Sequence, residues 1–162
     1  MGYSIYIKDP DTGETIELAE PHHIAGSTYC IGGTTELYLS ITYNYSPFYY
    51  RAETLGESTK VYGEKPVDGA LPVLHEEYGG IYGLQALTIP QARERVLRAI
   101  NALRDEALDE HGRPYVLTAS DKEQGHTIDN YWVPTERNAR KALVNLLNLL
   151  ILAPEHGKIE VY

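Results

Sequence analysis

Polar side chains at alternate positions between residues 34 and 51 are the best candidates for chemistry in this sequence. Tyr38, Ser40, Thr42 and Asn44 alternate with apolar residues, and a period of two places them on one face of a predicted β-strand. Hydroxyl and amide groups can hydrogen-bond to ribose, to base edges or to amides, but they are not acid–base catalysts. This face predicts binding rather than catalysis, and a solvated strand surface is the simpler interpretation.

Aromatic residues next to this strand could supply a stacking surface. Tyr49 and Arg51 follow it in an aromatic cluster that ends in a cation, and the only tryptophan is Trp132. The chain has 14 tyrosines against one phenylalanine, and tyrosine is common at recognition surfaces. Trp132 could stack on a base or a sugar, or be an ordinary core aromatic. The tyrosines could equally reflect the β-propensity of half-buried strand positions.

Positive charges gather at the start of the second long predicted helix. Arg137, Arg140 and Lys141 stand against a single Glu136, although cations at a helix N-terminus oppose the macrodipole. Guanidinium groups and free helix N–H groups together make an anion site, for instance for a phosphate. We therefore expect Arg137 to contact a ligand. The simpler interpretation is that these cations pair with surface acids.

Signatures of metal binding or hydrolysis are weak. His22 and His23 are adjacent, without an H-x-x-x-H or C-x-x-C companion, and His126-Thr127 is only half of a two-histidine phosphoesterase signature. No nucleophile elbow or P-loop is present. We expect no metal, no cofactor and no catalytic residue. The alternative is a nucleotide or phosphodiester hydrolase with a histidine as general base.

The secondary-structure pattern predicts a single α+β domain over residues 1–162. Strands are predicted around residues 3–7, 15–18, 34–45, 115–118 and 158–162, with a polar loop at 119–127. Two long amphipathic helices are predicted, at 89–110 with a capping box from Thr88 and after Thr135, and short helices at 49–55 and 70–78. We expect two layers, with a largely antiparallel sheet and both long helices on one face.

Composition excludes several classes of partner. The formal charge of −9 argues against a nucleic-acid polymer, because phosphate backbones are bound by clustered Lys and Arg. The single cysteine excludes an internal disulfide, and the N-terminus does not resemble a signal peptide. The most apolar run, at residues 142–153, is too short to span a bilayer. We expect a cytoplasmic protein without membrane contact.

Two short motifs resemble a known family. Residues 40–49, SITYNYSPFY, are similar to an N-x-T-x-N-x-[SA]-P-[MF] pattern of small phage, prophage and bacterial proteins. Residues 134–139, PTERNA, are similar to the P-T-x-x-N-A ending of that family. The sequence departs from the pattern at Ser40, where the family has Asn. The resemblance implies a polar site that includes Thr42, Asn44 and Asn138.

These observations predict a phage-type protein that binds without catalysis. Small phage proteins commonly act on the host, and sequestering a nucleotide-derived immune signal needs aromatic, amide and cationic groups but no nucleophile. The expected ligand site is Tyr38, Ser40, Thr42, Asn44, Tyr49, Arg51, Trp132, Arg137 and Asn138, and we expect a homo-oligomer located, if phage-encoded, in the host cytoplasm. An interaction or homo-oligomerising module that uses the Tyr-rich strand face is the first alternative. A hydrolase with His22, His23 or His126 as general base is the second.

Overall fold

The computed structural model has an α+β fold with antiparallel sheets, as predicted, and describes residues 2–24, 33–57 and 79–162. The predicted helix at 70–78 lies outside these residues. The main sheet has the order β4-β1-β5, formed by Gly2–Lys8 (β1), Tyr38–Thr42 (β4) and Lys158–Val161 (β5). A second sheet pairs Glu17–His22 (β2) with Thr34–Glu36 (β3). β1 is antiparallel to both of its neighbours, with Tyr6 opposite Tyr38 on one side and opposite Glu160 on the other.

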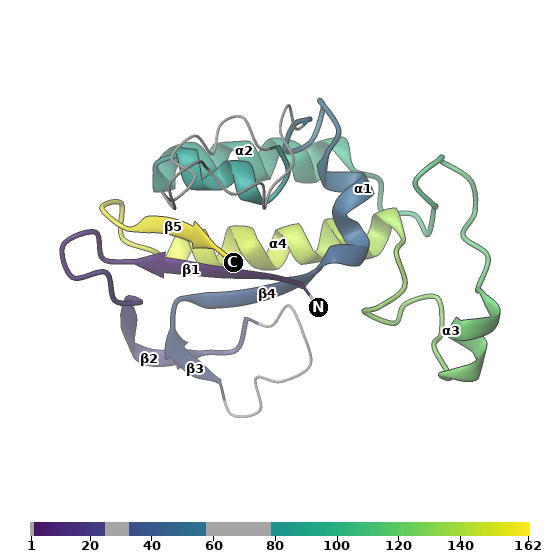
Figure 1. Cartoon of the computed structure of the whole chain (residues 1–162), viewed down its shortest axis with the longest axis horizontal. Coiled ribbons are helices and arrows are strands. Elements are labelled where there is room, and N and C mark those ends of the chain that lie inside the picture. Colours follow the sequence, from purple (N-terminus) through teal and green to yellow (C-terminus); the bar gives the residue numbers. More distant parts are fainter. Residues whose placement is uncertain (1, 25–32, 58–78) are drawn as a thin grey trace, which may run out of the picture.

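The apolar layer behind the main sheet is built by the long helices Ile89–Ala102 (α2) and Glu136–Leu152 (α4) (Figure 1). α4 packs against β4 and against α2, while the 3₁₀ helix Tyr82–Ala86 (η4) packs against β5. Alternate strand residues enter this core, as the period of two predicts: Tyr3, Ile5, Ile7, Leu39, Ile41, Ile159 and Val161 are buried. The opposite side chains of the same strands form the outer face of the sheet.

Both predicted helix starts are confirmed. The Thr88 hydroxyl accepts from the Gln91 N–H at 3.3 Å, and the Gln91 side chain accepts from the Thr88 N–H at 3.0 Å. Thr135 caps α4 by accepting from the Asn138 N–H at 3.2 Å. α2 ends at Ala102 rather than near residue 110.

The predicted strand at 34–45 is divided and shorter: Thr34–Glu36 (β3) pairs with β2, and Tyr38–Thr42 (β4) pairs with β1. Its pairing with β1 ends at Thr42, and Tyr43–Tyr45 (η1) and Ser46–Tyr49 (α1) turn the chain helical. The cause is local, because the Thr42 hydroxyl accepts from the Asn44 N–H at 3.2 Å and so starts a 3₁₀ turn. The Thr42 hydroxyl is therefore occupied by the backbone N–H of Asn44.

The first hairpin is also shorter than predicted, because only its turn region pairs with β1. The Ile16 N–H donates to the Ile7 carbonyl at 2.9 Å, after which the chain leaves β1 and continues into β2. The Ile7 N–H in turn donates to the Leu37 carbonyl at 2.9 Å, so Leu37 takes over the pairing.

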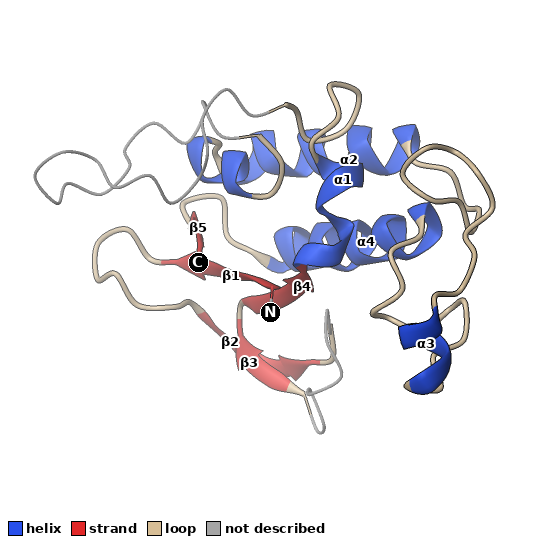
Figure 2. Cartoon of the chain, turned by 45° about the vertical axis from the view of Figure 1, so that its right-hand side comes forward, coloured by secondary structure: helices blue, strands red, loops and turns tan. Residues whose placement is uncertain are grey.

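Residues 104–135 form a long connection between the two helices, which Figure 2 shows looping away from the sheet and carrying the short helix Ala119–Glu123 (α3). The predictions of a strand at 115–118 and a polar loop at 119–127 are wrong. Residues 115–118 make no strand, and Thr118 with Asp121 forms a capping box that starts α3. Within the described residues, the pairing here is limited to an isolated antiparallel bridge between Leu108 and Pro114 and a bond from the Tyr115 N–H to the Ala107 carbonyl at 2.9 Å, so no strand forms.

Candidate functional site

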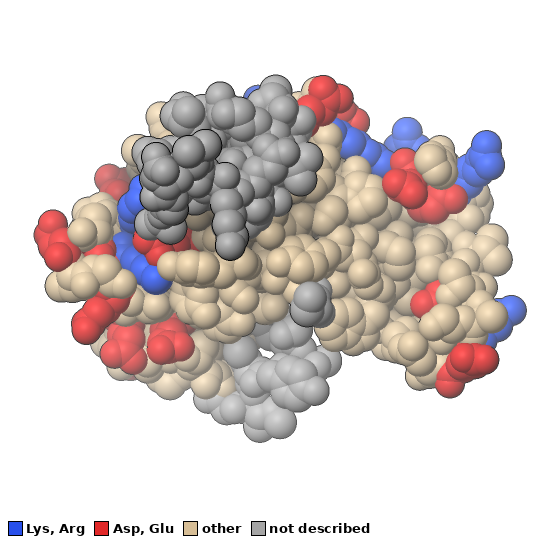
Figure 3. All heavy atoms as spheres, in the orientation of Figure 1, with Lys and Arg blue, Asp and Glu red and all other residues tan. Residues whose placement is uncertain are grey.

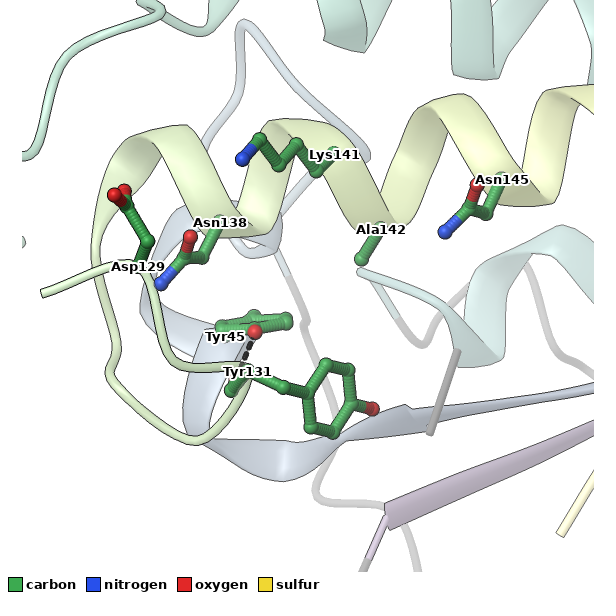
Figure 4. Close-up of a pocket in the computed structure, with 7 residues that line it drawn as sticks. All are labelled: Tyr45, Asp129, Tyr131, Asn138, Lys141, Ala142 and Asn145. Atoms are coloured by element: carbon green, nitrogen blue, oxygen red, sulfur yellow. Dashed lines mark hydrogen bonds between the residues drawn. The ribbon is translucent and has the colours of Figure 1, made fainter. Parts of the chain in front are cut away.

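A groove with a volume of about 200 Å³ lies between the first turns of α4 and residues 128–133. Figure 4 shows the side chains that line it, which come from η1, from residues 129–131 and from one face of α4. They are Tyr45, Asp129, Tyr131, Asn138, Lys141, Ala142 and Asn145. Asn138 belongs to the predicted site, and Lys141 to the predicted group of cations.

Asn138 holds one wall of this groove in place. Its side-chain nitrogen points to three backbone carbonyls, at 2.9 Å from Val133, 3.1 Å from Asn130 and 3.4 Å from Ile128. The residue itself is buried. An amide NH₂ has two hydrogens to donate, so these carbonyls use its donor capacity. Within the described residues, nothing donates to the Asn138 amide oxygen, which remains as the acceptor on this side chain.

Asn44 and Thr42 hold the same wall from the side of the sheet. The Asn44 side-chain nitrogen donates to the Trp132 carbonyl at 2.9 Å, and the Thr42 backbone N–H donates to the Tyr131 hydroxyl at 2.7 Å. The two sequence motifs therefore converge on residues 128–133. The side-chain amides of Asn44 and Asn138 donate to backbone carbonyls of this segment and hold it in place.

The aromatic side of the groove is closely packed. The Tyr45 hydroxyl donates to the Tyr131 carbonyl, and the two rings meet edge-to-face with centroids 5.7 Å apart. Burial raises the pKa of the Tyr131 hydroxyl to about 12, although the hydrogen bond from the Thr42 N–H opposes this shift. Tyr131 is therefore a neutral hydrogen-bonding group at physiological pH.

The start of α4 differs from the predicted anion site, because its first N–H groups already have protein acceptors. The four bonds are Glu136 N–H to the Leu108 carbonyl, Arg137 N–H to the Glu106 carbonyl, Asn138 N–H to the Thr135 hydroxyl and Ala139 N–H to the Thr135 carbonyl. The expectation of free N–H groups for a phosphate is wrong. The physical reason is tertiary: residues 104–114 run across the helix start and supply the carbonyls.

Arg137 is placed between two acids. Its guanidinium lies 3.4 Å from Asp105 and 3.4 Å from Asp129, and about a third of the side chain is exposed. Surface pairing, the simpler interpretation of this cation, describes the contacts it makes here. Lys141 is exposed, and no ion pair to it is found within the described residues. Of the cations at this helix start, Lys141 is the one that lines the groove.

Arg51 and Glu136 form a partly buried ion pair away from the groove. Their side chains meet at 2.8 Å, and Arg51 also donates to the Glu110 carbonyl at 3.0 Å. The second Glu136 carboxylate oxygen is buried and has no hydrogen-bond partner among the described residues. Arg51 thus joins residues 104–114 to α1 and α4 and does not face the groove.

The remaining predicted residues lie elsewhere. Tyr49 is fully buried, with its hydroxyl donating to the Ala139 carbonyl at 2.9 Å, so the prediction that it contacts a ligand does not hold. Tyr38 and Ser40 are half-buried on the outer face of the sheet. Trp132 is 37% exposed and packs edge-to-face on Tyr131, but it does not line the groove.

Several groove residues were missed from the sequence alone, and some had a signal. Asn138, Lys141, Ala142 and Asn145 are spaced by three and four residues, which places them on one face of a helix. Asp129 and Tyr131 had no such signal, because only the fold brings them beside α4. Tyr45 follows Asn44 and so falls outside the predicted polar face of the strand.

The histidines are dispersed. The His22 ring is buried with both nitrogens occupied, Nε2 at 2.6 Å from the Glu36 carbonyl and Nδ1 accepting from the Ile24 N–H at 3.2 Å. His126 lies 3.8 Å from Asp121, and Figure 1 places β2 and α3 at opposite ends of the molecule. Within the described ranges, no three His, Cys, Asp or Glu side chains are placed to hold a metal ion. None of the described helices is long and apolar enough to cross a membrane.

Comparisons with known proteins leave the family open. A scan against protein-family models and searches of curated proteins and of solved structures found no match for this chain. The resemblance of the two motifs to phage and prophage proteins therefore stays a prediction.

Proposed function

We propose that this protein binds a small nucleotide-like ligand in the groove beside α4 and sequesters it without chemical change. The observation that carries the proposal is the convergence of both sequence motifs on residues 128–133, one wall of the groove. Hydrogen bonds from Asn44 and Asn138 hold this wall. Pre-organised sites lose less free energy on binding than sites that must order first.

The chemical inventory of the groove supports binding rather than turnover. It offers a lysine, a carboxylate, amides and phenol rings, which can hydrogen-bond to a sugar, a base or a phosphate. His22, one of the three histidines considered as a general base, has both ring nitrogens in use and is remote from the groove. A protein that sequesters its ligand requires affinity for it and no catalytic group.

The biological role follows from the predicted family. A phage-type protein that removes a nucleotide-derived immune signal from the host cytoplasm would keep the host defence from responding. Such sequestration needs neither a metal nor a cofactor, and it requires the protein to accumulate to at least the concentration of the signal.

The test is to identify what the protein retains. Purified protein is incubated with lysate from defence-activated cells, repurified and heated, and the released small molecules are analysed by mass spectrometry. We expect an intact nucleotide-like molecule in stoichiometric amount from the wild type and none from Lys141→Glu. Lys122→Glu makes the same charge change at an exposed position on α3 and should retain the ligand. A processed product would favour the hydrolase instead.

A second candidate function is self-association through the outer face of the sheet. Three tyrosine rings are neighbours there: the centroid of the Tyr6 ring lies 4.8 Å from that of Tyr38 and 5.7 Å from that of Tyr162. In the view of Figure 3, the part of the middle that grey atoms leave visible is mostly uncharged, and Lys, Arg, Asp and Glu atoms gather toward both sides. The ion pair Lys8–Glu160 lies beside these rings, with the Lys8 ammonium 5.5 Å from the Tyr6 ring centroid and 5.0 Å from that of Tyr162. Tyrosine-rich surfaces are typical of interfaces. Sedimentation equilibrium of the wild type and of Tyr38→Ser tests it: an oligomer that Tyr38→Ser dissociates supports self-association, and a monomeric wild type contradicts it.

A further inference from the structure

From the polar groups of the groove we infer which part of the ligand enters: the ribose, with its 2′- and 3′-hydroxyls donating to Asp129 and Asn138, and with a phosphate outside near Lys141. This inference rests on the proposed function and adds the orientation of the ligand.

The size of the groove limits what can enter. Its volume of about 200 Å³ is below the range of roughly 300–1,000 Å³ that is usual for sites enclosing a whole small ligand. A groove of this size suits part of a nucleotide better than the whole. One moiety, a sugar or a base, enters, and the rest of the ligand remains at the rim.

Two polar groups of the groove accept hydrogen bonds: Asp129, whose side chain is 60% exposed, and Asn138, which is buried. An ionised Asp129 is an acceptor only, and Asn138 has spent its amide hydrogens on backbone carbonyls, which leaves its amide oxygen. The entering moiety must therefore bring donors. Two neighbouring hydroxyls meet this need, and a carboxylate that binds ribose hydroxyls is a recurring solution in nucleotide sites.

A phosphate does not fit at this position. It would bring further acceptors to the Asp129 carboxylate, and the N–H groups at the start of α4 already have protein acceptors. Lys141 is the group that suits a phosphate. It is exposed one helical turn beyond Arg137, and Figure 4 shows it lining the groove together with Asn138 and Asp129.

A base is also a poor fit, because it needs an open aromatic face on which to stack. The two rings in the groove, Tyr45 and Tyr131, pack edge-to-face on each other at an interplanar angle of 78°. The Trp132 ring does not line the groove. The base then remains outside, where its identity matters little to affinity.

Asp129 is held in position for this role. Asn138 binds the carbonyls of its two chain neighbours, Ile128 and Asn130, and the Arg137 guanidinium lies 3.4 Å from its carboxylate. Arg137 is thus a positioning residue. Its other acidic partner, Asp105, does not line the groove and offers a matched control.

The experiment is isothermal titration of the full-length protein with AMP, 2′,3′-dideoxy-AMP and GMP. We expect AMP and GMP to bind alike and the dideoxy compound to bind at least about 10-fold more weakly, since hydrogen bonds to charged groups are lost. Asp129→Asn should weaken AMP but leave the dideoxy compound unchanged, which a general loss of structure would not do. Asp105→Asn should leave the ratio between the affinities for AMP and for 2′,3′-dideoxy-AMP unchanged.

The alternative outcomes separate the two proposals. Equal affinity for AMP and the dideoxy compound overturns the ribose assignment and leaves the proposed function intact. A preference for GMP over AMP assigns the groove to the base, and also overturns the ribose assignment. Absence of binding by all three probes overturns nucleotide binding itself, and the inference with it.

Discussion

The sheet with its two long helices and the connection 104–135 are held together by different physics. The main buried cluster is built from the strands, η1, α1, η4, α2, α4 and residues next to them, whereas the fully buried Val133 of the connection lies outside this cluster. That connection is instead fastened by polar contacts from Asn44, Arg51 and Asn138 to its backbone carbonyls. Tyr131 packs against the core only as a partly buried ring.

The difference separates what stabilises the fold from what shapes the groove. Burial of apolar surface is non-directional and is shared among many side chains. A few hydrogen bonds are directional, and each one matters locally. Substitutions in the core should therefore lower global stability. Substitutions of Asn44, Arg51 or Asn138, which bond to the backbone of residues 104–135, should alter that connection and the groove while leaving the core folded.

The largest effect is expected in the core. Leu143 is fully buried on α4, and Leu143→Ala should lower the free energy of unfolding by about 2–5 kcal/mol through lost burial and a residual cavity. Leu97→Ala is the matched control, since Leu97 is exposed on α2 and should change stability by less than about 0.5 kcal/mol. Urea denaturation measures both, and equal losses would contradict the contrast.

The second-largest loss of stability is expected at the Arg51–Glu136 ion pair. Arg51→Met leaves the nearly buried Glu136 carboxylate without its cation, at a cost of about 3 kcal/mol. The double variant Arg51→Met/Glu136→Leu removes the uncompensated charge and should recover most of this loss. Urea denaturation of both variants gives the comparison. A double variant no more stable than the single one would show that the charge is not the cause.

Asn138→Ala should have a smaller global effect and a clear local one. It removes donors to the carbonyls of Ile128, Asn130 and Val133, at a cost of about 1–3 kcal/mol. Hydrogen exchange should rise in residues 128–133 and stay slow in β1. Asn138→Asp keeps the shape and suits a helix N-terminus, yet lacks the amide donors. Asn138→Asp should show the same increase in hydrogen exchange at residues 128–133. Unchanged exchange would show that the Asn138 side-chain N–H groups do not hold this segment in place.

The smallest effect concerns acid pH and is confined to α3. The Thr118 backbone N–H and then the Tyr115 hydroxyl donate to Asp121 and hold the pKa of its carboxyl below the ordinary value. A lowered carboxyl pKa stabilises the folded form above the unfolded pKa of about 4, and this contribution is lost as the pH falls below it. NMR titration from pH 6 to 3 should show α3 losing order before the sheet does. Asp121→Asn should abolish this pH dependence.

Helices and core positions were predictable because their signals are local or periodic. The caps at Thr88 and Thr135 follow from side chains that bond to the backbone a turn away. The buried positions of β1 and of residues 38–41 in β4 follow from alternation, whereas Thr42 is buried against it. The end of β4 at Thr42 was not predictable in this way, because alternation continues beyond it and only one hydroxyl bond starts the turn.

The site was predictable only in part. The motif residues Thr42, Asn44 and Asn138 do meet at one place, but an amide donor in a sequence gives no sign of whether it will face a ligand or a carbonyl of its own chain. Asp129 and Tyr131 reach the groove through the long connection, whose path depends on carbonyls that cap α4. Such tertiary capping leaves no pattern along the sequence.

Tyr131 also covers the end of an edge strand of the main sheet. β4 is the last strand on its side of the main sheet, and an uncovered edge strand can pair with the edge of another chain. The Tyr131 hydroxyl accepts from the Thr42 N–H at 2.7 Å and so occupies a position that an added strand would use. The same side chain that lines the groove therefore occupies one backbone donor at the end of this sheet edge.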